Sequence, residues 1–156
     1  MYNVVLFRPE IPHNTGAIGR LVLATGAHLH LIKPLGFAID DKAVKRAGLD
    51  YWKDVKVTVW ENWEEFERGR NQERSLFLLT TKAERSYFEA KFKRGDYLVF
   101  GPESRGLPEV LLDDYKEDVL TIPMAPGAVR SLNLATAVSV VLYEGVRQGG
   151  GLGMES

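Results

Sequence analysis

The sequence predicts an α/β protein in which a mainly parallel sheet is covered by helices on both faces. Short apolar runs rich in β-branched and aromatic residues alternate with segments of helical periodicity along the 156 residues. Strands that alternate with helices in this way favour parallel pairing and helices on both faces of the sheet. Hydrophobic residues make up 45% of the chain, and no linker or internal repeat divides it. We therefore expect one domain over residues 1–148, followed by a flexible glycine-rich tail at 149–156.

Six short apolar runs, bounded by Gly, Pro or polar residues, are predicted to be strands. Their approximate ranges are 2–7, 28–33, 55–60, 75–80, 96–100 and 119–123. The last two lead directly into loops that contain Gly, Pro and a few polar side chains. Ligands of open α/β sheets bind beyond the carboxyl ends of the strands, so these two loops predict a small-molecule pocket.

Apolar periodicity and capping residues predict the helices between these strands. A first helix over Asn14–Thr25 ends at Gly26, a residue type that often terminates helices. The clearest helix is Asn133–Arg147, which carries a wide apolar face. Shorter helices are expected from a cap at Asp40 or Asp41 through Arg46, and over Glu61–Arg70, Ser86–Phe92 and Pro108–Tyr115.

Composition and charge narrow the function classes. The chain has no cysteine, which excludes disulfides, thiol catalysis and cysteine metal sites and favours a cytoplasmic protein. The first residues do not resemble a signal peptide, and no apolar run approaches the roughly 18 residues needed to span a bilayer. The net charge of −1 argues against a generally basic nucleic-acid-binding domain, although a local basic patch remains compatible with it.

The loop after the first strand contains Asn14, Gly16 and Gly19, which resemble a dinucleotide-binding G-x-G-x-x-G pattern with Asn in place of the first Gly. That match is weak, because Lys33–Gly36 follows the second strand where an acidic residue would hold a ribose. Arg20 lies in the otherwise apolar first helix. Its side chain either reaches along the helix into solvent or presents a fixed guanidinium to an anionic or polar substrate group.

The other two loops also allow a structural and a functional interpretation. Glu103 and Arg105 either pair with each other in solvent or face a ligand. Ser131 and Asn133 flank the start of the last helix, where either could cap it. The three histidines of the chain do not form a metal-ligand set, so no metal is predicted.

Three segments resemble, in order and spacing, the signature motifs of the SPOUT superfamily of S-adenosylmethionine-dependent RNA methyltransferases. The first is Asn14-x-Gly16-x-x-x-Arg20, the second is residues 100–107, and the third runs from Ile122-Pro123-Met124 through Ser131-Leu132-Asn133-Leu134. The resemblance covers residues 2–148. It implies a trefoil knot in the C-terminal half, which general topology rules would not suggest.

Residues 10–16, 48–51 and 79–82 are similar to one subfamily that has no added RNA-binding domain. The resemblance implies 2′-O-methylation of the ribose at the tRNA wobble position 34, on cytidine or uridine. It also implies a homodimer with an active site shared between subunits, and S-adenosylhomocysteine as the product. Methylation of another RNA position and non-catalytic RNA binding are the alternatives.

The resemblance also assigns residues to roles. The residues expected to bind the cofactor are Leu79, Gly101, Ile122, Met124, Ser131 and Leu132. The residues expected at the reaction centre are Arg20, Ser131 and Asn133. Contacts with the anticodon stem-loop are a separate expectation: Asn14, Glu103 and Arg105 are candidates, and because the chain is nearly neutral overall we also expect them from the scattered cations Arg8, Lys42, Lys45, Arg46 and Arg130. Lys42, Lys45 and Arg46 have helical spacing, which a solvated helix face explains equally well.

A guanidinium rarely gives up its proton, so Arg20 is expected to orient the ribose and a phosphate rather than to act as a base. The proton of the 2′-hydroxyl would leave through a phosphate oxygen or water, with Ser131 and Asn133 holding the hydroxyl. His13 is a weaker candidate base. Ala135 stands where related sequences often have Ser, and residues 125–129 are apolar, which weakens the case for polar substrate contacts there.

Overall fold

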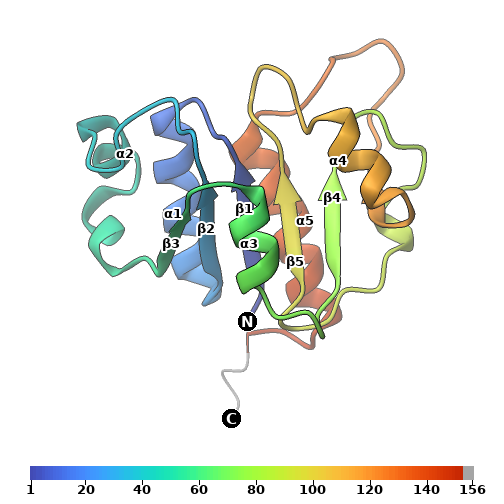
Figure 1. The fold of residues 1–156 in the computed structure, drawn as a ribbon, viewed down its shortest axis with the longest axis horizontal. Helices are drawn as coiled ribbons and strands as arrows, with labels where there is room; N and C mark the ends of the chain where they lie inside the picture. Colours follow the sequence, from blue (N-terminus) through green and yellow to red (C-terminus); the bar gives the residue numbers. More distant parts are fainter. Residues whose placement is uncertain (153–156) are drawn as a thin grey trace.

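All six predicted strands are present in the computed structural model, which describes residues 1–152, and they form one parallel sheet (Figure 1). Their order across the sheet is β3-β2-β1-β5-β4-β6. The strands are β1 (Asn3–Phe7), β2 (His28–Ile32), β3 (Val57–Trp60), β4 (Leu76–Leu79), β5 (Tyr97–Phe100) and β6 (Val119–Leu120). The mainly parallel sheet is thereby confirmed. The last strand is shorter than predicted, because beyond Leu120 the chain forms an isolated bridge between Thr121 and Ser86.

The helices begin and end close to the predicted residues. They are α1 (Pro12–Thr25), α2 (Lys42–Ala47), α3 (Trp63–Gly69), α4 (Glu109–Asp114) and α5 (Leu134–Gln148), with 3-10 turns η1 (Leu49–Asp54), η2 (Tyr87–Glu89) and η3 (Lys116–Asp118). Of the two predicted caps for α2, Asp41 is the one used, since its carboxylate accepts from the Ala43 N–H at 2.7 Å. The predicted helix over 86–92 is wrong apart from the short turn η2.

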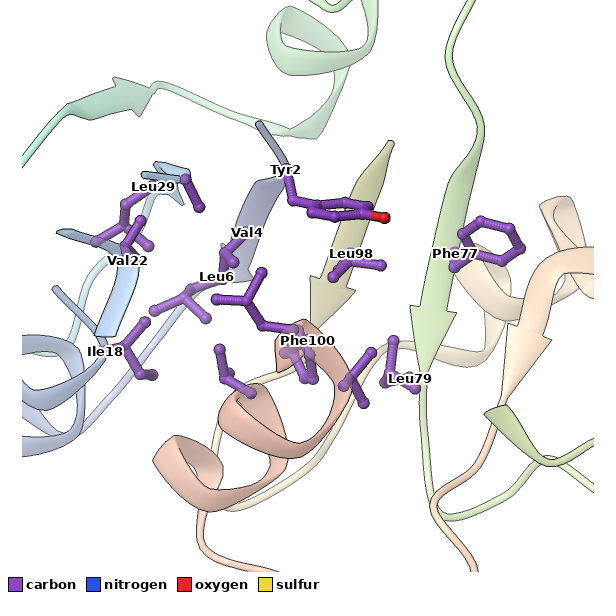
Figure 2. Packing of buried hydrophobic residues seen from close by; sticks show 14 of the residues in the cluster. Tyr2, Val4, Leu6, Ile18, Val22, Leu29, Phe77, Leu79, Leu98 and Phe100 are labelled. Atoms are coloured by element: carbon purple, nitrogen blue, oxygen red, sulfur yellow. The ribbon is translucent and has the colours of Figure 1, made fainter. Parts of the chain in front are cut away.

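The alternation of side chains along each strand divides the apolar residues between two cores. On one face, Val4 and Leu6 of β1 pack with Ile18 of α1 and with residues of α5, as Figure 2 shows in part. On the other face, Val5 and Phe7 pack beneath α3 and α4. Helices therefore cover both faces of the sheet, as predicted.

Two glycines of the dinucleotide-like pattern serve the packing of α1 against α2 and η1. A Cβ atom at Gly16 would lie 2.2 Å from the carbonyl oxygen of Val44. A Cβ atom at Gly19 would lie 2.5 Å from the indole ring of Trp52. These glycines are thus required for close approach of the helices, which accounts for the pattern without a bound dinucleotide.

The chain that follows β6 lies against the connection between β4 and β5. The Thr121 N–H donates to the Arg85 carbonyl at 2.8 Å, and the Tyr87 N–H donates to the Thr121 carbonyl at 2.9 Å. The trefoil knot stays a prediction. Of the predicted flexible tail, Gly151 donates to the Val146 carbonyl at 2.9 Å, whereas residues 153–156 lie outside the described residues. Within residues 1–152, no helix is long and apolar enough to cross a membrane.

Candidate active site

A cavity of about 550 Å³ opens at the carboxyl ends of β4, β5 and β6, where the two predicted ligand loops meet. All six residues expected to bind a cofactor line it, namely Leu79, Gly101, Ile122, Met124, Ser131 and Leu132. Thr80, Lys82 and Thr121 line it as well, although the sequence motifs gave them no role in the site. Thr80 and Thr121 directly follow β4 and β6, and Lys82 lies two residues beyond Thr80, so their signal was a position at strand ends on the ligand edge of the sheet.

A chain of side-chain amide and carboxylate contacts joins the three polar loops beside this cavity. The Asn14 amide nitrogen donates to Oε2 of Glu103 at 3.1 Å. The Asn133 amide nitrogen donates in turn to Oδ1 of Asn14 at 3.2 Å. Asn14 is buried, with 5% of its surface exposed, so its amide is held by these two partners. The three motifs are therefore connected by one continuous set of hydrogen bonds.

Asn133 also caps the last helix. Its Oδ1 accepts from the Ala135 N–H at 2.9 Å and from the Thr136 N–H at 3.4 Å. Of the two predicted capping candidates, Asn133 is the cap. Ser131 lies on the cavity wall instead.

Glu103 binds the start of α1 rather than Arg105. Its two carboxylate oxygens accept from the N–H groups of Glu10 at 2.8 Å and Ile11 at 3.0 Å, in addition to Asn14. The helix N-terminus carries partial positive charge, which favours a carboxylate at this position. The Glu10 carboxylate in turn accepts hydrogen bonds from the N–H and the hydroxyl of Ser104. These bonds hold the pKa of the Glu10 carboxyl below its usual value.

Positive charge lies around the cavity mouth. Lys82, Arg105 and Arg130 line it, and Lys82 also forms an exposed ion pair with Glu109 at 3.5 Å. The predicted substrate contacts Arg105 and Arg130 are thus beside the predicted cofactor residues. Guanidinium groups bind phosphate well, so these residues suit the mouth to an anionic group.

The structure does not place Arg20, Lys42 or Arg46 at this cavity. Arg20 is exposed on α1, and its guanidinium carbon lies 5.5 Å from the ring centroid of Tyr51. Lys42 and Arg46 are exposed on α2, beyond α1 from the cavity lining. Within one chain, the predicted catalytic arginine therefore lies outside the cavity that the predicted cofactor residues line.

Arg8 is exposed at the end of β1 with a left-handed backbone, φ 51°. Its guanidinium carbon lies 4.8 Å from the ring centroid of Phe7. A left-handed conformation is costly for a residue with a Cβ atom and often occurs at functional sites.

Two histidines lie in the sheet, away from the cavity, and have structural partners. His30 is buried; its Nδ1 accepts from the Trp60 indole at 3.0 Å and its Nε2 is 2.9 Å from Oδ1 of Asn3. Burial lowers the pKa of His30 to about 3 and also lowers the pKa of His28. Among residues 1–152, no group of three or more histidines and carboxylates is placed to hold a metal.

The fold and the cavity define an α/β protein with a six-stranded parallel sheet and a cavity at the ends of three neighbouring strands. The model of the SpoU rRNA Methylase family matches residues 1–143, and the chain belongs to this family.

Relatives of similar length carry a more specific name. The tRNA (cytidine(34)-2'-O)-methyltransferase of Saccharophagus degradans is 51% identical over 149 residues, which cover 95% of this chain and 96% of that protein. The protein of the same name from Escherichia coli K12 is 50% identical, with 95% and 94% covered.

Solved structures agree with this family. One, described as giving insight into the 2-OH methylation of C/U34 on tRNA, is 48% identical with a TM-score of 0.90, and 95% of each chain is covered. The SpoU methyltransferase AviRb of Streptomyces viridochromogenes, solved with the cofactor AdoMet, is 28% identical with a TM-score of 0.76. That match covers 94% of this chain and 59% of AviRb.

Proposed function

We propose that this chain is an S-adenosylmethionine-dependent methyltransferase that modifies the ribose 2′-hydroxyl of cytidine or uridine at position 34 of tRNA, and that it acts in the cytoplasm. Relatives about 50% identical over nearly their whole length carry this name. The observation that carries the proposal is the convergence of all six expected cofactor residues on one cavity, next to the linked side chains of Asn14, Glu103 and Asn133.

The cavity suits S-adenosylmethionine in size and chemistry. Its volume of about 550 Å³ is typical of small-molecule sites, which span about 300–1,000 Å³. Leu79, Ile122 and Leu132, which line it, offer apolar surface for an adenine ring. The bound cofactor would supply an electrophilic methyl group on a sulfonium and leave as S-adenosylhomocysteine.

Positioning accounts for much of the rate in such a displacement, because both reacting groups are then held in line. In our proposal Ser131 and Asn133 hold the ribose hydroxyl beside the cavity. The proton leaves to a phosphate oxygen or water. A guanidinium orients the ribose and its phosphate and stabilises the charge that develops on the 2′-oxygen.

That guanidinium is Arg20 of the partner subunit in a homodimer. Arg20 does not line the cavity of its own chain, so a second copy is needed to bring it to the reaction centre. The exposed position of Arg20 on α1 leaves it free to reach a neighbouring subunit. We also propose the trefoil knot for the segment after β6, on the grounds of family membership.

The anticodon stem-loop would be bound by scattered cations, because the chain carries a net charge of −1. Arg105 and Arg130 at the cavity mouth, with Arg8, Lys42 and Arg46, are the proposed phosphate contacts. Each phosphate contact releases counterions, so tRNA affinity should fall steeply as salt increases. Binding that is insensitive to salt would contradict this electrostatic account.

Methyl transfer to bulk tRNA tests the proposal. The purified protein is incubated with labelled S-adenosylmethionine and tRNA from cells that lack the modification, and the labelled nucleoside is mapped. Label on the 2′-oxygen of nucleotide 34 is the expected result. Label at another tRNA position, or on ribosomal RNA alone, would favour the alternative substrates. Binding of RNA and cofactor without transfer would refute the enzymatic function.

A further inference from the structure

Two loops beside the cavity exchange hydrogen bonds, and a glutamate of each loop, Glu10 or Glu103, accepts from donors of the other loop. The carboxylate of Glu103 accepts from the N–H groups of Glu10 and Ile11 at 2.8 and 3.0 Å. In return, the carboxylate of Glu10 accepts from the N–H and the hydroxyl of Ser104, both at 2.8 Å. We call Glu10, Ile11, Glu103 and Ser104 the reciprocal clamp, because each loop supplies both a carboxylate and the donors for the other.

The reciprocal clamp holds the apex of the 101–106 loop, which the hydrogen bonds within that loop do not hold. Within residues 101–106, the N–H groups of Gly106 and Arg105 donate to the Pro102 carbonyl at 2.9 and 3.4 Å and so close the base of the turn. Ser104 lies at the exposed apex of this turn and also lines the cavity. Glu10 therefore fixes the apex, although Glu10 itself is not part of the cavity wall.

We propose that Glu10 is a positioning residue for cofactor binding, which acts through Ser104 by holding the apex of the 101–106 loop in its binding shape before the cofactor arrives. This inference rests on the proposed function, since it concerns the same cavity. A loop that is already ordered loses less conformational freedom when a ligand binds, so the affinity is higher. Through Glu103 and Asn14 the clamp also ties this loop to the first turn of α1, the helix that carries Arg20.

Calorimetric titration of the full-length protein with S-adenosylmethionine and with S-adenosylhomocysteine tests the inference. Glu10→Ala should weaken the binding of both ligands about fivefold, the effect of losing roughly one typical net hydrogen bond. Ser104→Ala removes the hydroxyl but keeps the N–H, so a smaller loss of about twofold is expected. Glu73→Ala is the matched control, because Glu73 is exposed and lies outside the cavity lining. This variant should bind both ligands with the affinity of the wild type.

Two further readouts separate positioning from general destabilisation. In steady state, Glu10→Ala should raise the KM for S-adenosylmethionine with kcat nearly unchanged, because saturating cofactor restores the loop. The double variant Glu10→Ala with Ser104→Ala should bind no more weakly than Glu10→Ala alone, since both remove the same link. Glu10→Gln, which keeps one acceptor and the side-chain shape, should bind with intermediate affinity and replaces Glu10→Ala if that variant unfolds.

The outcomes distinguish the inference from the function beneath it. Wild-type protein that binds the cofactor while Glu10→Ala and Glu10→Gln bind it equally well would overturn the positioning role alone. A fall in kcat at unchanged KM would overturn it too. Wild-type protein that binds neither ligand would refute the proposed function, and the role of Glu10 with it.

Discussion

Replacing Asn14 by Asp tests the hydrogen-bonded connection between the three motifs. The substitution keeps the size of the side chain and the acceptor for Asn133, but it places a carboxylate oxygen where the amide now donates to Glu103 at 3.1 Å. Two unit charges at that distance repel by about 5 kcal/mol at an effective dielectric constant of about 20. Because Glu103 is partly exposed, solvent screens the pair, and we expect a net loss of about 2–3 kcal/mol at pH 7.

The loss should depend on pH with a defined sign. Repulsion raises the pKa of the new carboxyl in the folded protein above its unfolded value of about 3.9. Stability relative to the wild type is then retained below about pH 4, where the protonated carboxyl can donate to Glu103. It is lost as pH rises, at about 1.4 kcal/mol per unit, so the whole loss accumulates between about pH 4 and pH 6.

Denaturant unfolding at several pH values measures this difference. Asn14→Ala removes the same donor without a charge and should cost about 1–2 kcal/mol at every pH. The Asp variant should therefore be the more stable of the two near pH 4 and the less stable at pH 7. Asn62→Asp is the matched control, because Asn62 caps α3 and a carboxylate is favourable there. If the Asp and Ala variants at position 14 show the same difference from wild type at every pH, Asn14 does not face Glu103 and the connection is wrong.

Further predictions concern arginines and histidines outside the cavity. Arg20→Lys should lower turnover about tenfold or more while calorimetric cofactor affinity stays unchanged; near-full turnover would show that a planar guanidinium is not needed. Arg8→Gly should weaken tRNA binding in a filter assay. The free energy of unfolding should change by less than about 1 kcal/mol, because relief of the left-handed backbone offsets the lost contact between Arg8 and Phe7. Unchanged tRNA affinity would remove Arg8 from the RNA site. The wild type should lose stability as pH falls below about 6.5, because the pKa of His30 drops to about 3 in the folded protein and unfolding therefore takes up protons. His30→Gln should show a shallower decline between pH 6.5 and 5 in thermal unfolding, and an equal decline would assign the effect to other groups.

Local sequence signals predicted the helices and strands well where interactions between residues close in sequence determine them. Asp41 and Asn133 have the side chains that satisfy free N–H groups at helix starts, and both are caps in the structure. The short apolar runs are rich in β-branched and aromatic residues, which pack well on a pleated, half-buried surface, and all of them contain strands in the structure. The segment 86–92 differs because a tertiary contact overrides its helical pattern: the Tyr87 N–H bonds to Thr121, far along the chain.

The connections within the candidate site depend on residues distant in sequence. Glu103 and Arg105 have opposite charge and adjacent positions, so a local pair was a reasonable hypothesis. The actual donors to Glu103 lie in residues 10–14, and no local pattern marks them. The family resemblance supplied the cavity residues because it carries information about which loops meet, which periodicity alone does not contain.

The position of β1 in the sheet has a consequence for the growing chain on the ribosome. β1 lies between β2 and β5, and Asn3 pairs with both His28 and Tyr97. One edge of this first strand therefore stays without its neighbour until β5 has been synthesised, and the apolar side chains meant for α5 stay uncovered even longer. Such an edge is a template for pairing with other chains. The nascent protein is thus exposed to aggregation until β5 and then α5 have been synthesised, and binding by a chaperone would matter most before that point.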